Sequence, residues 1–232
     1  ASDVYKRQIQ YFFGGWEPPF GINLRVDGLS ALVALAVSTV SLLTAIYSKR
    51  AVPAETSDKV SQFYTLYLLS VTGLLGIVLT GDAFNLYVLI EISALTSYAL
   101  IGMGSRRATL AAYKYLIMGT IGATFIVIGI GLLYQVTGTL NMADIAKRLP
   151  EHGYDRTVIA AFAFLLIGAA LKIALFPLHQ WLPNAYTYAP STVSAFLAAT
   201  ATKVSVYILL RFLFTVFGVH FSFEVLSTAI PL

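Results

Sequence analysis

The sequence contains no cysteine, which excludes disulfides, thiolate nucleophiles and cysteine-ligated iron–sulfur clusters from this chain. It has only three histidines, at positions 152, 179 and 220, and so few do not favour a haem held between two of them. It also lacks a glycine-rich phosphate loop, an HExxH motif and a nucleophile elbow, so nothing in it indicates hydrolysis or nucleotide binding. We therefore expect a chain that is not itself an enzyme and that holds no cofactor and no metal.

Charge is also scarce. Only 11% of the 232 residues are charged, against roughly 25% in a soluble domain, and 58% are hydrophobic. With a mean hydropathy of +0.78, this composition is typical of an integral membrane protein. The net charge of +4 leaves basic residues chiefly to loops and helix ends, which fits the loop bias of membrane proteins better than nucleic-acid binding.

Six apolar segments are each about long enough to cross the hydrocarbon core, which takes roughly twenty helical residues. They are residues 28–48, 63–80, 84–101, 112–136, 158–182 and 191–217. A seventh segment is expected to begin near Phe221. The predicted fold is all-α, a polytopic transmembrane bundle of six to seven helices. Residues 28–217 would form the membrane domain, residues 1–27 a lead-in outside it or at its surface, and residues 218–232 the start of a truncated further helix.

The loops predict how these segments are arranged. The turn at Gly81 and Asp82 leads almost directly from the second segment into the third, so these two segments must form an antiparallel hairpin. In the polar loop before Arg156, the sequence MADIAKRL indicates a short surface helix. One side of the membrane receives Lys49, Arg50, Lys59, Arg106 and Arg107 in short loops, and we assign that side to the cytoplasm; the opposite side carries Arg25, Lys147, Arg148 and Arg156. The expected location is a prokaryotic plasma membrane.

Three ionisable residues, Glu91, Lys172 and Lys203, lie deep inside these segments, where a charge facing lipid costs several kcal/mol. Intramembrane charges of this kind mark ion pathways. Each also has a purely structural interpretation. Glu91 can be satisfied by the small and polar residues that follow it, Lys172 can cap free carbonyls, and Lys203 can pair with another helix.

Prolines cluster between the two lysines. Pro177 removes the hydrogen bond to the carbonyl of Ile173, right beside Lys172, and so predicts a break in the fifth segment. A broken helix next to a buried charge is typical of transport proteins, because the break brings water and free carbonyls to the charge.

Two further residues are weaker candidates. Lys114 is expected in the first turn of the fourth segment, where it either takes part in proton transfer or simply reaches the lipid headgroups. His179 follows the break and either relays protons at near-neutral pH or caps and packs.

Several stretches resemble a known family: GDAFNLYVLIEISALTSYALIG at 81–102, AAYKYLIMGTIGA at 111–123, and above all ALKIALFPLHQWLPNAYTYAPSTVSAFLAATATKVSVYIL at 170–209. This is the proton-conducting antiporter family, which includes the D subunit of Mrp-type sodium/proton antiporters and antiporter-like subunits of respiratory complex I and membrane-bound hydrogenases. The resemblance implies about fourteen transmembrane helices in two inverted five-helix repeats, each with a broken helix. This chain would be the part up to the end of the first repeat.

The resemblance also implies roles for individual residues. Glu91 matches the family's essential glutamate and Lys172 the lysine at the first broken helix. Lys203 matches the lysine that passes protons toward the second repeat, and Lys114 a commonly basic position. The link at 81–85 and the lead-in GGWEPPFGI look more like the Mrp-type D subunit than complex I.

The sequence thus predicts a membrane subunit of a multisubunit monovalent cation (Na⁺)/proton antiporter, translocating protons through a buried Glu/Lys relay. Its partners would be other membrane subunits, protons, Na⁺ and the lipid bilayer, with no nucleic acid. The alternative is a proton-pumping, antiporter-like membrane subunit of complex I or a hydrogenase. A third interpretation is a membrane scaffold whose buried charges only hold helices together.

Overall fold

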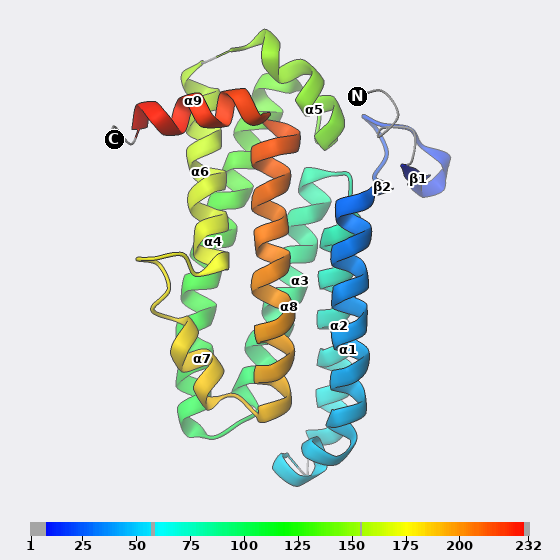
Figure 1. The fold of residues 1–232 in the computed structure, drawn as a ribbon, viewed down its shortest axis with the longest axis vertical. Coiled ribbons are helices and arrows are strands. Elements are labelled where there is room, and N and C mark those ends of the chain that lie inside the picture. The colour runs from blue at the N-terminus through cyan, green and yellow to red at the C-terminus, as the bar shows by residue number, and fades with distance from the viewer. Residues whose placement is uncertain (1–7, 57–58, 154, 230–232) are drawn as a thin grey trace.

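A computed structural model describes residues 8–56, 59–153 and 155–229 of the chain. Most of them form a bundle of long helices standing side by side (Figure 1). In the described part, six helical spans are long and apolar enough to cross a membrane, as the sequence predicts. They are Gly28–Glu55, Val60–Leu79, Ala83–Gly102, Arg106–Thr137, Arg156–Ile173 and Ser191–Val216. The predicted all-α transmembrane bundle is therefore confirmed.

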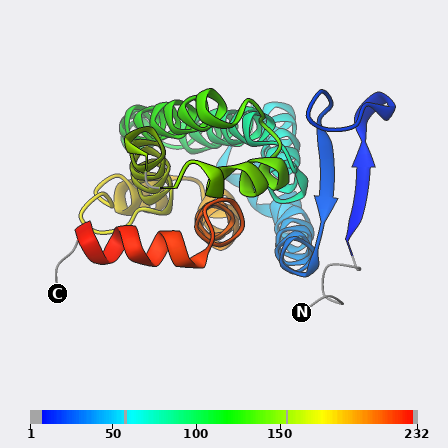
Figure 2. The same ribbon diagram turned by 90° about the horizontal axis from the view of Figure 1, so that it is seen from above.

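The elements in chain order are β1 (Ile9–Phe12), the 3₁₀ turn η2 (Phe13–Gly15), β2 (Asn23–Val26), α1 (Gly28–Glu55), α2 (Val60–Leu79), α3 (Ala83–Gly102), α4 (Arg106–Thr137), α5 (Met142–Arg148), the 3₁₀ turn η4 (Leu149–Glu151), α6 (Arg156–Ile173), α7 (Leu182–Tyr188), α8 (Ser191–Leu210), the π-helical turn η5 (Arg211–Val216) and α9 (Val219–Ala229). The short helix predicted at MADIAKRL is α5. α9 begins near the expected seventh segment, and it lies across the end of the bundle instead of along it (Figure 2).

Two helices continue beyond the apolar segments that are expected to cross the membrane. α1 continues through Lys49 and Arg50 to Glu55, and α4 begins at Arg106, six residues before the expected start. A helix satisfies its own backbone hydrogen bonds, so it continues beyond the hydrocarbon where charged side chains reach water. Lys114 is consequently the ninth residue of α4, and its predicted place in the first turn is wrong.

The fifth predicted segment is indeed broken, but not at Pro177. α6 ends at Ile173, Ala174 adopts a left-handed conformation with φ 62°, and the amide of Leu175 donates to the carbonyl of Ala170 over 3.0 Å. Pro177 lies beyond this end, in the loop 174–181 that leads to α7. The left-handed Ala174 therefore ends the helix, and the idea that Pro177 breaks a hydrogen bond inside it is wrong.

Glycines let α4 and α6 pack closely against each other. A side chain on Gly168 of α6 would come within 2.7 Å of the carbonyl oxygen of Gly122 on α4. Small residues allow this approach, and backbone contact of this kind holds helices together in lipid, where hydrophobic burial gives no driving force between them. Gly168 is one turn before Lys172, so this contact also fixes where Lys172 lies.

The N-terminal residues form an antiparallel hairpin, β1 with β2, beside one end of the bundle (Figure 2). Asn23 of β2 accepts a hydrogen bond through its backbone carbonyl from the amide of Gly81, and its side chain accepts one from Asn141 over 3.0 Å. A side chain at Gly81 would clash with Asn23. The hairpin, the α2–α3 turn and the start of α5 are thereby joined.

An ion pair joins the first and last membrane spans at the same end. Asp27 caps α1 through a reciprocal pair of hydrogen bonds with Ser30, and it also contacts Arg211 at 2.5 Å. Burial raises the pKa of Asp27, but the hydrogen bond from Arg211 and those from Ser30 outweigh it and lower the pKa to about 2. Arg211 in turn donates to the hydroxyl of Tyr207 over 2.8 Å.

The opposite end of the bundle gathers the end of α1 and the starts of α2 and α4 (Figure 1). These elements carry the five basic residues that assign this side to the cytoplasm, and the orientation itself stays a prediction. Glu55 accepts hydrogen bonds there from the hydroxyl and from the backbone amide of Ser191, the latter at 3.0 Å. The first turn of α8 is therefore capped by α1.

Candidate functional site

Glu91 is the ninth residue of α3, roughly 12 Å along a helix of about 30 Å. Its Oε1 atom is buried and has no hydrogen-bond partner in the described part of the chain. The nearby hydroxyls of Ser93, Thr96 and Ser97 donate to carbonyls of their own helix. These hydroxyls therefore do not donate to Oε1. They are not the partners that a purely structural role of Glu91 would require.

Lys172 lies in the last turn of α6, which ends partway along the bundle (Figure 1). Its side chain is 7% exposed, and its Nζ atom has no hydrogen-bond partner among the described residues. A cation near a helix C-terminus is favoured by the partial negative charge there. Because its Nζ donates to no described group, Lys172 does not cap the carbonyls at the end of α6. The carbonyl of Leu171 instead accepts hydrogen bonds from the amide of Ala174 and the indole of Trp181.

Glu91 and Lys172 come from different helices, and Glu91 is near enough to act electrostatically on Lys172. No direct salt bridge between them is recorded in the described structure. Lys172 lines a cavity of about 30 Å³ between α2, α3, α4, α6 and α8. Its polar lining also includes Ser93, Ser97 and Ser205. A cavity needs about 10–15 Å³ to hold a water, so this one has the size for hydration, and its polar side chains offer partners for a water within an otherwise apolar lining.

Tyr115 of α4 lines the cavity and belongs to a group of packed aromatic side chains. Trp181 lies parallel to Tyr115 with ring centroids 4.0 Å apart, and Tyr115 meets Tyr98 edge to face at 4.5 Å. Tyr98 is seven residues after Glu91, on the same face of α3 and within its electrostatic reach. Its hydroxyl is buried without a hydrogen-bond partner in the part of the chain described. Sequence reasoning missed Tyr98 and Tyr115, although the spacing from Glu91 indicates Tyr98.

Lys203 lies apart from this cluster. It is exposed on α8, and its Nζ donates to the carbonyl of Ala198 over 2.6 Å and to the hydroxyl of Thr202 over 3.4 Å. Ser205, two residues later, does reach the Lys172 cavity. Lys203 and the Lys172 cavity are therefore on different sides of α8.

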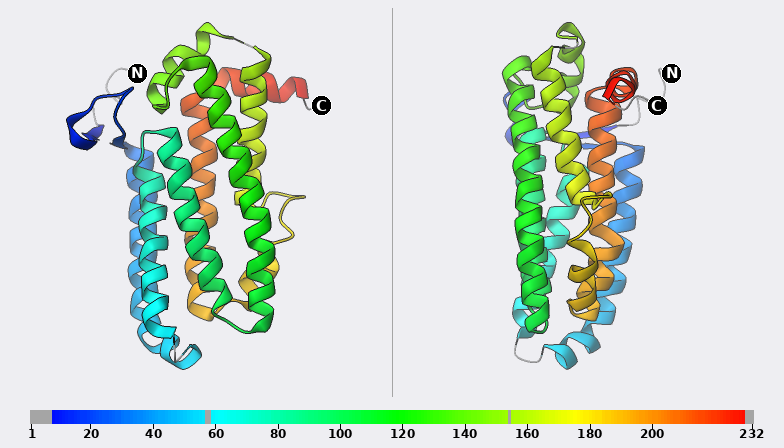
Figure 3. Two further views of the ribbon diagram at one scale, coloured as in Figure 1. Left: turned by 180° about the vertical axis from the view of Figure 1, so that it is seen from behind. Right: turned by 90° about the vertical axis from the view of Figure 1, so that its left-hand side faces the viewer.

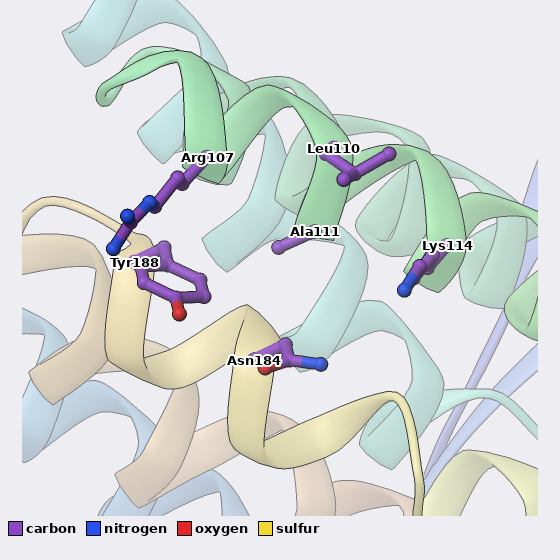
Figure 4. Close-up of a pocket in the computed structure, with 6 residues that line it drawn as sticks. All are labelled: Arg107, Leu110, Ala111, Lys114, Asn184 and Tyr188. Carbon is purple, nitrogen blue, oxygen red and sulfur yellow. The ribbon is translucent and has the colours of Figure 1, made fainter.

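The remaining predicted residues are also outside the cavity. Lys114 is exposed on α4 and faces α7 across a groove (Figure 4). His179 is in the loop between α6 and α7, with its ring 5.6 Å from that of Phe176 and its Nδ1 buried without a hydrogen-bond partner in the described structure. Pro177 is exposed in the same loop. Proton-transfer roles for Lys114 and His179 stay predictions.

A membrane bundle with an interrupted helix, an unpaired buried carboxylate oxygen and an unpaired amine beside a small cavity defines an antiporter-like membrane protein. Residues 80–230 match the family described as "NADH:quinone oxidoreductase/Mrp antiporter, TM", and the chain belongs to that family. The resemblance seen in the sequence is thereby confirmed.

Curated relatives come from both branches of the family. NADH-quinone oxidoreductase subunit N of Desulforudis audaxviator is 47% identical over 89% of this chain and 41% of its own length. The D subunit of a Na(+)/H(+) antiporter of Bacillus subtilis is 36% identical over 95% of this chain and 44% of its own length. The chain thus spans less than half the length of these relatives. They do not decide between the branches, so the greater likeness to the antiporter branch stays a prediction.

Solved structures show the same fold. An archaeal membrane-bound sulfane sulfur reductase, a respiratory membrane complex, superposes with a TM-score of 0.84 at 36% identity, covering 91% of this chain and 43% of the other. The Mrp complex from Dietzia sp. DQ12-45-1b gives 0.79 at 30% identity, covering 90% and 39%. Both are multisubunit membrane complexes, which supports other membrane subunits as partners.

Proposed function

We propose that this chain is part of a membrane subunit of a monovalent cation (Na⁺)/proton antiporter, and that it moves protons through Glu91, Lys172 and Lys203. The observation that carries the proposal is the pair Glu91 and Lys172, each with a buried polar atom that lacks a hydrogen-bond partner among the described residues. Burying such polar atoms without hydrogen bonds costs free energy unless they are hydrated or change protonation. A role in proton transfer accounts for their presence here.

The proposed cycle begins at the end of α6. The ammonium of Lys172 gives a proton to water in the adjoining cavity and becomes a neutral amine, and it later takes a proton back. Glu91 is near enough to act electrostatically on Lys172, and it would bias this exchange. Glu91 therefore tunes Lys172, and His179 in the neighbouring loop stays a candidate for the exchange with water.

Lys203 would carry the proton sideways. It lies on the outer face of α8, while Ser205 of the same helix reaches the Lys172 cavity. A proton leaving that cavity would pass along α8 to Lys203 and from there to the rest of the full-length subunit. This mechanism requires the full-length subunit and its membrane partners. The proposed location is a prokaryotic plasma membrane.

The test is ion flux in sealed vesicles that carry the complex with the full-length subunit. A sodium gradient should drive proton movement without any redox substrate, and a protonophore should abolish the pH change. Vesicles in which sodium leaves the internal pH unchanged would contradict the antiporter.

A second candidate is a proton-pumping membrane subunit of a redox enzyme, whose chemistry takes place in partner subunits. The specific observation in its favour is the 47% identity to NADH-quinone oxidoreductase subunit N. In the same vesicles this function predicts proton movement only when an electron donor and acceptor are added. Glu91 and Lys172 have the same role under both candidate functions. The two functions differ in the driving force for proton movement, which is a sodium gradient in one and electron transfer in the other.

A further inference from the structure

α7 lies beside the first turns of α4, at the end of the bundle where α4 begins (Figure 3). A groove runs between these two helices, and its lining residues differ from those of the Lys172 cavity. It has a volume of about 270 Å³ and is lined by Arg107, Leu110, Ala111 and Lys114 of α4 and by Asn184 and Tyr188 of α7 (Figure 4). Its volume is slightly below the range of about 300–1,000 Å³ typical of small-molecule sites, which suits a ligand of headgroup size.

The lining carries two positive charges and no acidic residue. In the described structure neither Arg107 nor Lys114 has a recorded salt bridge. Arg107 lies over the ring of Tyr188, 6.0 Å from its centroid, and this contact holds the guanidinium at the mouth of the groove. The amide of Asn184 and the hydroxyl of Tyr188 add neutral hydrogen-bond donors. The groove therefore fits an anion with several acceptor oxygens, such as a phosphodiester.

The depth of the groove indicates where that anion comes from. Arg107 is the second residue of α4, and Lys114 lies two turns further into the membrane, about 10 Å along the axis. Side chains on a helix lean toward its N-terminus, so the amine of Lys114 reaches back toward Arg107 and the membrane surface. The two charges thus lie along the same groove, near the end of the bundle where α4 begins.

Below Lys114 the same face of α4 becomes apolar. Ile117, Ile121 and Ile128 follow at spacings of three, seven and fourteen residues from Lys114, and they are 40%, 42% and 39% exposed. A cationic groove at the surface with an exposed apolar stripe beneath it matches the two parts of a phospholipid. A free phosphate would use only the first part.

We propose that the groove between α4 and α7 binds the headgroup of an anionic glycerophospholipid, with its acyl chains along the apolar stripe of α4. The site does not depend on the proton relay, and it assigns Lys114 to lipid binding. Tyr188 and Asn184 connect the bound headgroup to α7, the helix that follows the break.

The test uses the assembled complex with its full-length subunit in phosphatidylcholine vesicles containing a small fraction of photoactivatable phosphatidylglycerol. Cross-links mapped by mass spectrometry should fall on α4 and α7. The double variant Arg107→Gln/Lys114→Gln should reduce labelling there roughly tenfold or more, since each basic residue near the surface attracts anionic lipid. The charge-retaining variant Arg107→Lys/Lys114→Arg should keep most of it.

Two comparisons test whether labelling is specific to this groove and to an anionic lipid. The matched double variant Lys49→Gln/Arg50→Gln removes two charges from the same end of the bundle, outside the groove, and should leave labelling of α4 and α7 unchanged. Unlabelled phosphatidylglycerol should compete, whereas phosphatidylcholine and inorganic phosphate should not. Absence of labelling on these helices, equal loss in the control variant or competition by phosphatidylcholine would overturn the proposal. Competition by inorganic phosphate would overturn it too, and would make this a site for a soluble anion.

Discussion

Trp181 donates its indole N–H to the carbonyl oxygen of Leu171 over 3.2 Å, so the residue just before α7 caps the end of α6 across the break. The same indole is stacked on Tyr115 of α4. Trp181 and the backbone of Ala174 satisfy this carbonyl, while the amine of the neighbouring Lys172 has no hydrogen-bond partner among the described residues and Lys172 lines the cavity. The break is therefore an ordered connection, in which Trp181 links the end of α6 to α4 next to Lys172, and it is not a simple kink.

Trp181→Phe tests this arrangement. Phenylalanine keeps the stack on Tyr115 but loses the hydrogen bond, which should destabilise the subunit by about 1 kcal/mol and lower proton flux by loosening the end of α6. Assembly on a native gel and flux in the same vesicles are the measurements. Unchanged flux with normal assembly would show that the position of Lys172 does not depend on this cap.

Lys203→Ala should impair flux strongly, whereas Lys203→Arg should be only partly tolerated. Arginine keeps the charge but has a pKa above about 12 and does not readily release a proton. Flux is measured for both variants at equal amounts of assembled complex. Full activity of the arginine variant would mean that Lys203 serves as a fixed charge.

Gly168→Ala should displace α6 from α4, since the added carbon would meet the carbonyl of Gly122 at 2.7 Å. We expect a loss of about 1–3 kcal/mol in stability, as for other overpacked sites, together with reduced flux because Lys172 is one turn away. Gly131→Ala on α4 is the matched control, because a side chain there meets nothing within 4 Å. Equal thermal stability of the two variants in detergent would refute this view of the contact.

Asp27 predicts a pH dependence at the other end of the bundle. Its pKa is lowered to about 2 in the folded protein from an ordinary value of 3.8, so its pair with Arg211 stabilises the fold fully above about pH 4. That contribution should be lost as the pH falls from about 4 to about 2. The measurement is the difference in Tm between wild type and Asp27→Asn, which should shrink over this range. A constant difference would show that the charge of Asp27 contributes nothing.

The sequence was sufficient for much of the fold, because long apolar runs in a chain with 11% charge have few alternatives to membrane helices. It was also sufficient to single out Glu91 and Lys172 as buried charges. Helix ends were less predictable: α4 begins at Arg106, and hydrophobicity carries no information about a helix that continues into water. The break was placed at Pro177, although Ala174, the only non-glycine residue with positive φ among those described, ends the helix.

The site needed tertiary information for the rest. Tyr115 follows Lys114 in the sequence, yet the two residues face different ways: Tyr115 lines the Lys172 cavity and Lys114 the groove toward α7. Lys203 lies as deep in its apolar segment as a buried residue could, but the packing of α8 leaves its side chain exposed. Depth in a membrane segment is visible in the sequence, whereas the direction of a side chain depends on which helices pack around it.

The most direct test of the account is proton flux in vesicles carrying the complex with Glu91→Gln in its full-length subunit. Glutamine keeps the size of the side chain and loses the charge that acts on Lys172. We predict that the complex assembles in normal amounts on a native gel and that coupled proton flux is abolished. Flux at the wild-type level in this variant would contradict the proposal that protons move through Glu91 and Lys172.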